Sequence, residues 1–298
     1  MMKRFTRRQL LQGTGAALAL WGLKRTRLLA QEGTLEQSLL IGADELEAML
    51  SQSLPNLRLI DFRDQNTYLS GHLPQVLPLW QTAITVTRAG VPGLVAPAET
   101  VNDVFSRVGL DSESQVVVYG DSGSIWASRL FWVLDYYGHS NVRLLDGGFP
   151  YWKAQGRSLA LGIASPTAGH FEAIPQPQKL VETDWVLAHL DDPTVVFVDA
   201  RDAETFAKGH LPGALSKPYK ENINWDTEQF KTTDELRARF ENAGITPEKT
   251  VISYCQLGVA GAQNYFVFRL LGYPDVRLYD GSFADWTSDA SRPVETGA

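Results

Sequence analysis

The sequence DFRDQNTYLSGHLP, at residues 61–74, returns as DARDAETFAKGHLP at residues 199–212, with eight of fourteen positions identical. A second block, VRLLDGGFPYW at residues 142–152, returns as VRLYDGSFADW at residues 276–286, with seven of eleven positions identical. The blocks keep their order, and their offsets differ by four residues. The chain therefore contains an internal duplication, and two copies of this length predict two similar domains.

Each copy alternates short apolar runs with helical patterns. Strands are predicted at residues 57–61, 115–119 and 142–145 of the first copy and at residues 195–199, 250–254 and 276–279 of the second. Helices are predicted over residues 233–243, where Thr232 and Glu235 fit a capping box, and over residues 259–271. Such alternation predicts α/β domains, each a parallel sheet covered by helices on both faces.

These patterns divide the chain into four parts. The predicted parts are an export signal peptide at 1–30, a first domain at 38–157, a linker at 158–182 and a second domain at 183–298. The linker contains three prolines and shows no clear periodicity.

Residues 1–30 carry seven Lys or Arg and no acidic residue, and residues 6–12 resemble a twin-arginine export signal. The apolar run that follows has about half the length that a bilayer requires. We therefore expect export to a periplasm or thylakoid lumen, with no stable membrane insertion after the signal is removed.

Charge and composition exclude several classes of partner. The whole chain has a net charge of -7, and loss of the seven basic residues lowers it to about -14, which repels nucleic acid. No P-loop or dinucleotide fingerprint is present, so no cofactor is predicted. The five histidines and single cysteine show no metal-ligand spacing, so no metal site is predicted.

The single cysteine, Cys255, directly follows a predicted strand and precedes a predicted helix. Ligand sites in parallel α/β sheets form at the carboxyl ends of strands. The backbone N–H groups of the intervening residues form an anion cradle that favours a thiolate. This predicted substrate-binding loop consists of Gln256, Leu257, Gly258, Val259, Ala260 and Gly261.

The ordered motifs Asp-x-Arg, Gly-His-x-Pro, Tyr-Cys-loop-helix and Asp-Gly-x-Phe-x-x-Trp resemble the rhodanese family of sulfurtransferases. The resemblance covers nearly all residues after about 38. It implies that Cys255 takes a sulfane sulfur from a small sulfur-containing anion, carries it as a persulfide and passes it to cyanide or a thiol. It also implies an inactive first domain and a catalytic second domain.

The first copy lacks the cysteine. Asp121 corresponds to Cys255 and cannot form a persulfide, so we interpret it as a helix cap. The first domain is then a structural partner that walls the cleft over Cys255. Asp199, Arg201 and His210 have counterparts in this cysteine-free copy, which favours structural support for all three.

The sulfur donor is the open question, because residues 256–261 contain no charge. Thiosulfate is favoured, with Arg129, Lys217 and Lys220 as candidate cations. A loop of the mercaptopyruvate type resembles Cys-Gly-Ser/Thr-Gly-Val-Thr, and this chain keeps only Gly258 and Val259 of it. The alternatives are therefore a 3-mercaptopyruvate sulfurtransferase and a non-catalytic binding or sulfur-carrier protein. A phosphatase on the related fold is excluded, because Gly261 replaces the arginine it needs.

Overall fold

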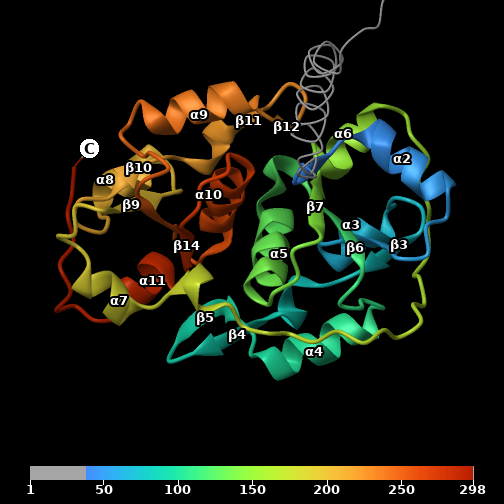
Figure 1. Cartoon of the computed structure of the whole chain (residues 1–298), viewed down its shortest axis with the longest axis horizontal. Helices are drawn as coiled ribbons and strands as arrows, with labels where there is room; N and C mark the ends of the chain where they lie inside the picture. The colour runs from blue at the N-terminus through green and yellow to red at the C-terminus, as the bar shows by residue number, and fades with distance from the viewer. Residues whose placement is uncertain (1–37, 298) are drawn as a thin grey trace, which may run out of the picture. The chain divides into compact units, whose positions relative to one another are not determined.

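A computed structural model describes residues 38–297, so the export signal predicted for residues 1–30 lies outside the described residues. Two five-stranded parallel sheets form the framework, one in each half (Figure 1). The first has the order β1 (Leu40–Ile41), β7 (Val142–Leu145), β6 (Gln115–Tyr119), β2 (Leu57–Asp61), β3 (Val76–Pro78). The second has the order β10 (Leu215–Ser216), β9 (Val195–Asp199), β13 (Thr250–Tyr254), β14 (Val276–Tyr279), β8 (Leu180–Val181). When the second order is reversed, its strands β8, β14, β13, β9 and β10 correspond one by one to β1, β7, β6, β2 and β3. The equivalent sheets confirm the predicted repeat.

Helices cover both faces of each sheet, as predicted. The first half contains α2 (Ala43–Ser51), α3 (Gln65–Leu69), α4 (Ala98–Arg107), α5 (Ile125–Tyr136) and α6 (Gly148–Ala154). The second contains α7 (Thr183–Ala188), α8 (Ala203–Lys208), α9 (Thr233–Glu241), α10 (Val259–Leu270) and α11 (Ser282–Trp286). Short 3-10 turns lie at Gln81–Ala83, Ser122–Ser124, Pro177–Lys179 and Tyr219–Asn222.

The predicted local elements agree closely with the structure. All six predicted strands have the predicted bounds. Helix α9 begins at Thr233 with the predicted capping box, in which Thr232 and Glu235 each bond to the other's backbone N–H. Helix α10 begins at the predicted Val259 and ends at Leu270, one residue early.

The predicted linker differs from the structure at its end. Leu180 and Val181 form β8, which pairs with β14, so they belong to the second sheet. Earlier linker residues are held by the first half, because Gly169 N–H donates to Ser106 O at 2.8 Å and Phe171 is buried. The proline-rich composition indicated a loop but could not show which surface holds it.

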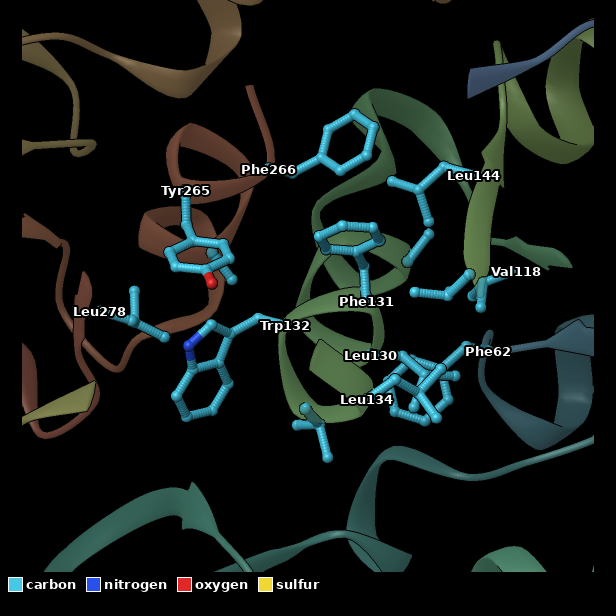
Figure 2. Close-up of a cluster of buried hydrophobic side chains, with 14 of the residues drawn as sticks. Phe62, Val118, Leu130, Phe131, Trp132, Leu134, Leu144, Tyr265, Phe266 and Leu278 are labelled. Atoms are coloured by element: carbon cyan, nitrogen blue, oxygen red, sulfur yellow. The ribbon is translucent and has the colours of Figure 1, made fainter. Parts of the chain in front are cut away.

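A single apolar core joins the two halves. Along β6, Val116 and Val118 point into this shared core, whereas Val117 and Tyr119 point to a separate core on the outer face. The shared core includes the contact of α5 with α10, where the rings of Phe131 and Phe266 meet edge to face at 4.9 Å (Figure 2). Because both central helices contribute, the two sheets share one buried interior.

Two antiparallel hairpins extend from the sheets toward the opposite half. They are β4 (Thr85–Arg88) with β5 (Val91–Val95), and β11 (Ile223–Asn224) with β12 (Gln229–Phe230). Val95 N–H donates to Asp280 Oδ2 at 2.8 Å, and Phe230 N–H donates to Asp146 Oδ1 at 2.9 Å. Each hairpin thus donates a backbone hydrogen bond to an aspartate of the other half. Asp280 follows β14, and Asp146 follows the equivalent strand β7.

The repeated Asp-x-Arg motif forms a buried ion pair in each half. In the first half, Arg63 Nη2 lies 2.6 Å from Asp61 Oδ2 and also donates to Gly71 O at 2.9 Å. In the second, Arg201 Nη2 lies 2.6 Å from Asp199 Oδ2 and donates to Gly209 O at 2.7 Å. The pair therefore fixes the Gly-His turn that follows it in the sequence.

No helix among residues 38–297 is long and apolar enough to cross a membrane.

The large aromatic side chains Trp152 and Trp286 are almost completely buried in the outer cores of the first and second halves.

We predict that Asp61→Ala lowers the free energy of unfolding by about 3–5 kcal/mol, because it leaves the buried Arg63 guanidinium without its partner. Urea unfolding followed by tryptophan fluorescence measures the change. Glu204→Ala is the control, since its ion pair with Lys208 has both side chains more than 70% exposed. Equal losses in the two variants would contradict a special role for the buried pair.

Candidate functional site

Cys255 lies at the carboxyl end of β13, in the turn that leads into α10. It is 4% exposed and has no disulfide partner. β13 lies between β9 and β14, so the turn also adjoins the residues that follow those two strands. The sequence thus places the one thiol of the chain where parallel α/β sheets bind ligands.

Helix α11 holds the cysteine turn from one side. Cys255 N–H donates to Ser282 Oγ at 3.1 Å, and Phe283 N–H donates to Cys255 O at 3.0 Å. Ala284 N–H donates to Gln256 O at 3.1 Å. Ser282 was not among the predicted site residues. The repeat did contain a signal for it, since the equivalent residue of the cysteine-free copy is Gly148.

The backbone N–H groups of residues 256–261 have no hydrogen-bond partner within the described part of the chain. The first hydrogen bond of α10 runs from Ala262 N–H to Gly258 O. Gly258 has φ of +76°, which turns the chain sharply before the helix. Unpaired N–H groups at a helix N-terminus favour an anion, so this turn can hold a thiolate or a persulfide.

A cavity of about 500 Å³ opens onto Cys255. Its apolar and aromatic wall consists of Ile125, Trp126, Pro218, Tyr219, Leu257, Val259 and Ala260. Its polar wall consists of Arg201, Asp202, Thr205, Lys220, Cys255 and Gln256. Ile125 and Trp126 belong to the first half, so the predicted wall over Cys255 is present. Four other cavities among the described residues, of about 350–490 Å³, do not contain the thiol.

Arg201 combines its structural ion pair with a place in this cavity. Burial of Arg201 acts to lower its pKa. The hydrogen bond to Asp199 and the charges of Asp199, Tyr254 and Cys255 act in the opposite direction and are stronger together, so the pKa of Arg201 is raised. The guanidinium also lies over the ring of Phe283, with Cζ 4.1 Å from the centroid. Arg201 therefore provides a fixed positive charge beside the thiol, which the assignment to structural support alone had missed.

The three candidate cations have different positions. Lys220 lines the cavity. Arg129 does not line it and instead forms a buried ion pair with Asp280. Lys217 donates to Arg239 O at 3.2 Å, and burial lowers its pKa. The expectation is therefore wrong for Arg129 and Lys217 as cavity residues, because long-range contacts direct both side chains elsewhere.

His210 contacts other structural groups and does not line the cavity of Cys255. Its Nδ1 is 2.9 Å from Phe206 O, and its ring stacks on the Phe206 ring at 3.7 Å. No group of three or more His, Cys, Asp or Glu residues suited to a metal occurs among residues 38–297.

The equivalent turn of the first half holds an internal carboxylate. Ser122 Oγ donates to Glu228 Oε1 at 3.0 Å, and Gly123 N–H donates to Glu228 Oε2 at 3.4 Å. Asp121 does not cap the helix, contrary to prediction; its carboxylate lies 3.9 Å from Arg63 Nη1, and burial raises its pKa. The fold therefore binds a carboxylate at the place that corresponds to the loop of Cys255.

Comparison with known proteins agrees with this geometry. A model of the rhodanese-like domain matches the chain twice, at residues 42–155 and 182–289. The chain belongs to the rhodanese family. It is 30% identical over 270 residues to a thiosulfate sulfurtransferase of Azotobacter vinelandii, covering 86% of this chain and 97% of that protein. It is 33% identical over 282 residues to a probable 3-mercaptopyruvate sulfurtransferase of Pseudomonas aeruginosa, covering 87% and 98%.

The fold agrees with a solved rhodanese structure. The crystal structure of SseA from Escherichia coli, a 3-mercaptopyruvate sulfotransferase, superposes with a TM-score of 0.76 and 28% identity, covering 83% of this chain and 99% of that one. The family relationship supports a sulfurtransferase enzyme of the rhodanese type, with two rhodanese domains.

We predict that Gly258→Ala lowers sulfurtransferase activity by about 10²-fold, because the loop must move. A Cβ there would lie 2.7 Å from Asp280 O and 3.0 Å from Asp280 Oδ1. Gly244→Ala is the control, because Gly244 has φ of +78° and an added Cβ would meet no atom within 4 Å. Both variants carry backbone strain of about 1–2 kcal/mol. Equal activity in the two would show that the packing around Gly258 is unimportant.

Proposed function

We propose that this rhodanese-family protein transfers a sulfane sulfur from thiosulfate to cyanide or a thiol through a persulfide on Cys255. The observation that carries the proposal is the placement of Cys255 in a turn with six consecutive N–H groups that are unpaired within the described chain, at a cavity that also contains Arg201 and Lys220. The turn favours sulfur anions, and the two cations suit the sulfonate end of thiosulfate.

The first half of the reaction loads the sulfur. The Cys255 thiolate attacks the outer sulfur of thiosulfate, and a new S–S bond forms. The old S–S bond breaks with its electron pair on the leaving group, which departs as sulfite. The product is a Cys255 persulfide anion, which the loop N–H groups stabilise as they stabilise the thiolate.

The second half discharges the sulfur. Cyanide carbon or an acceptor thiolate attacks the terminal sulfur of the persulfide. The S–S bond to Cys255 breaks, its electron pair returns to Sγ, and thiocyanate or the acceptor persulfide leaves. No metal or electron-transfer cofactor is needed to balance either half.

A second donor, 3-mercaptopyruvate, is favoured by a specific feature of the cavity. Seven of its wall residues are apolar or aromatic, which suits an organic donor better than inorganic thiosulfate. The relatives include both enzyme types, so the donor must be decided by experiment.

We predict that thiosulfate adds one sulfur, about 32 Da, to the protein lacking residues 1–30, and that cyanide then removes it. Intact-mass spectrometry measures both steps. Cys255→Ser is the control and must show no gain, since it removes the only thiol of the chain. A gain with 3-mercaptopyruvate alone would change the proposed donor. No gain with either donor would overturn Cys255 as a sulfur-transfer residue and favour a non-catalytic carrier or binding role.

We also propose that residues 1–30 direct export, on the basis of their twin arginines and lack of acidic residues. In a bacterial host with this export route, we expect the protein in the periplasm, shortened at its N-terminus. The variant carrying both Arg7→Lys and Arg8→Lys should remain in the cytoplasm at full length. Fractionation with N-terminal sequencing tests this, and a full-length cytoplasmic wild type would contradict it.

A further inference from the structure

Arg129, on α5 of the first domain, is fully buried but uses only part of its hydrogen-bonding capacity. Nη2 lies 2.5 Å from Asp280 Oδ1 and donates to Gly93 O at 3.0 Å. Nε and Nη1 are buried and have no hydrogen-bond partner among the described residues. Burial of a charged group with unused donors is costly, so stability alone does not explain this arginine.

The ion pair lies directly behind the sulfur-transfer loop. A Cβ on Gly258 would be 3.1 Å from Arg129 Nη1 and 3.0 Å from Asp280 Oδ1. Gly258 is three residues after Cys255 and caps α10. Val95 N–H bonds the other oxygen, Asp280 Oδ2, at 2.8 Å. The first domain therefore fixes both members of a charge pair that contacts the loop of the second.

The inactive half provides an internal comparison. Gln263 occupies the position on α10 that corresponds to Arg129 on α5, and its Nε2 donates to Gly123 O at 2.5 Å. Asp146, which corresponds to Asp280, receives hydrogen bonds from Gln229 and Phe230 and forms no ion pair among the described residues. Burial raises the pKa of Asp146. Among residues 38–297, a buried arginine therefore faces Asp280, next to the cysteine loop, and no arginine pairs with the equivalent Asp146.

We propose that Arg129 is a positioning residue for sulfur transfer, which neutralises Asp280 from the inactive domain and thereby lets the loop of Cys255 hold an anion. The proposal rests on the proposed function of Cys255. Without Arg129, the carboxylate of Asp280 would lie beside Gly258 and would oppose a second negative charge on the same loop. Without Asp280, the unpaired guanidinium would favour that charge. The two residues therefore have opposite effects on the thiolate.

The other charged groups near Cys255 are unchanged in all variants of the experiment that tests this proposal. Arg201 follows β9, and its pKa is affected by the charge of Cys255. Asp202 and Lys220 line the same cavity. Since these groups remain in place, a change between variants reports on Arg129 and Asp280.

The experiment measures the rate of alkylation of Cys255 by iodoacetamide against pH, using intact mass. The chain has one cysteine, so the signal is unambiguous, and alkylation needs no sulfur donor. Arg129→Gln should raise the midpoint of the pH profile by about one unit, as expected for one uncompensated charge nearby. Asp280→Asn should lower the midpoint. The double variant should return it close to that of the wild type.

Arg269→Gln is the matched control, because it also breaks an ion pair between the two halves, in this case between α10 and α5. Arg269 Nη1 lies 2.7 Å from Asp135 Oδ2. Arg269 is ten residues beyond Val259, about 15 Å along the helix from the loop. This variant should lower the urea midpoint of unfolding and leave the alkylation profile unchanged.

The outcomes separate positioning from structural support. If Arg129→Gln only lowers stability, as Arg269→Gln does, Arg129 is structural and the proposal is wrong. If Arg129→Gln does not fold, an unchanged profile in both Asp280→Asn and the double variant overturns the proposal.

The kcat for sulfur transfer should fall about 10–100-fold in Arg129→Gln with little change in KM, and recover in the double variant. Opposite shifts of the alkylation profile would support positioning even if neither donor loads Cys255, so the two proposals fail separately.

Discussion

The contact between α5 and α10 is the interaction on which the candidate site depends. Each helix begins at the loop after the central strand of its own sheet, and the two meet at Phe131 and Phe266 (Figure 2). Because the helices cross in a shared core, the second turn of each reaches the loop of the other. Arg129 thereby lies behind Gly258, and Gln263 bonds to Gly123. Separation of the halves would expose this core and remove the support of the cysteine loop.

The two hairpins, each of which bonds to the opposite half, explain why the loop of Cys255 is open and the equivalent loop of the first half is filled. Glu228 lies two residues before Phe230, whose N–H bonds Asp146; Gly93 lies two residues before Val95, whose N–H bonds Asp280. Both have left-handed backbones, with φ of +62° and +79°. The carboxylate of Glu228 enters the loop of the first half, whereas Gly93 has no side chain to enter the loop of Cys255. A side chain at this position would begin close to the loop, since a Cβ on Gly93 would lie 3.8 Å from Leu257 O. Under the proposed function, Gly93 therefore leaves the loop of Cys255 open to a sulfur anion.

Local sequence patterns predict the strands, the cap of α9 and the repeat of this structure. Strand bounds and the capping box of α9 follow from neighbouring residues, and the repeat predicts that both halves have the same sheet. The sequence offered Arg129 only as a candidate cation for the donor. Its ion pair could not be predicted, because the partner is Asp280, about 150 positions away. Asp121 was misjudged for a similar reason. The pattern fits a cap, but the buried Arg63 attracts its carboxylate from the other side.

The first half also indicates what the Asp-x-Arg pair contributes in the second. Arg63 already pairs with Asp61, yet its Nη1 has no hydrogen-bond partner among the described residues and lies 3.9 Å from the carboxylate of Asp121. A fork whose charge is largely compensated can still direct one N–H group toward a neighbouring anion. Asp121 corresponds in sequence to Cys255, so the first half has a carboxyl group where, under the proposed function, the second half holds a thiolate or persulfide. The copy without a cysteine thus has a carboxyl group, held near an arginine, at the position where the proposed function requires an anionic sulfur in the other copy.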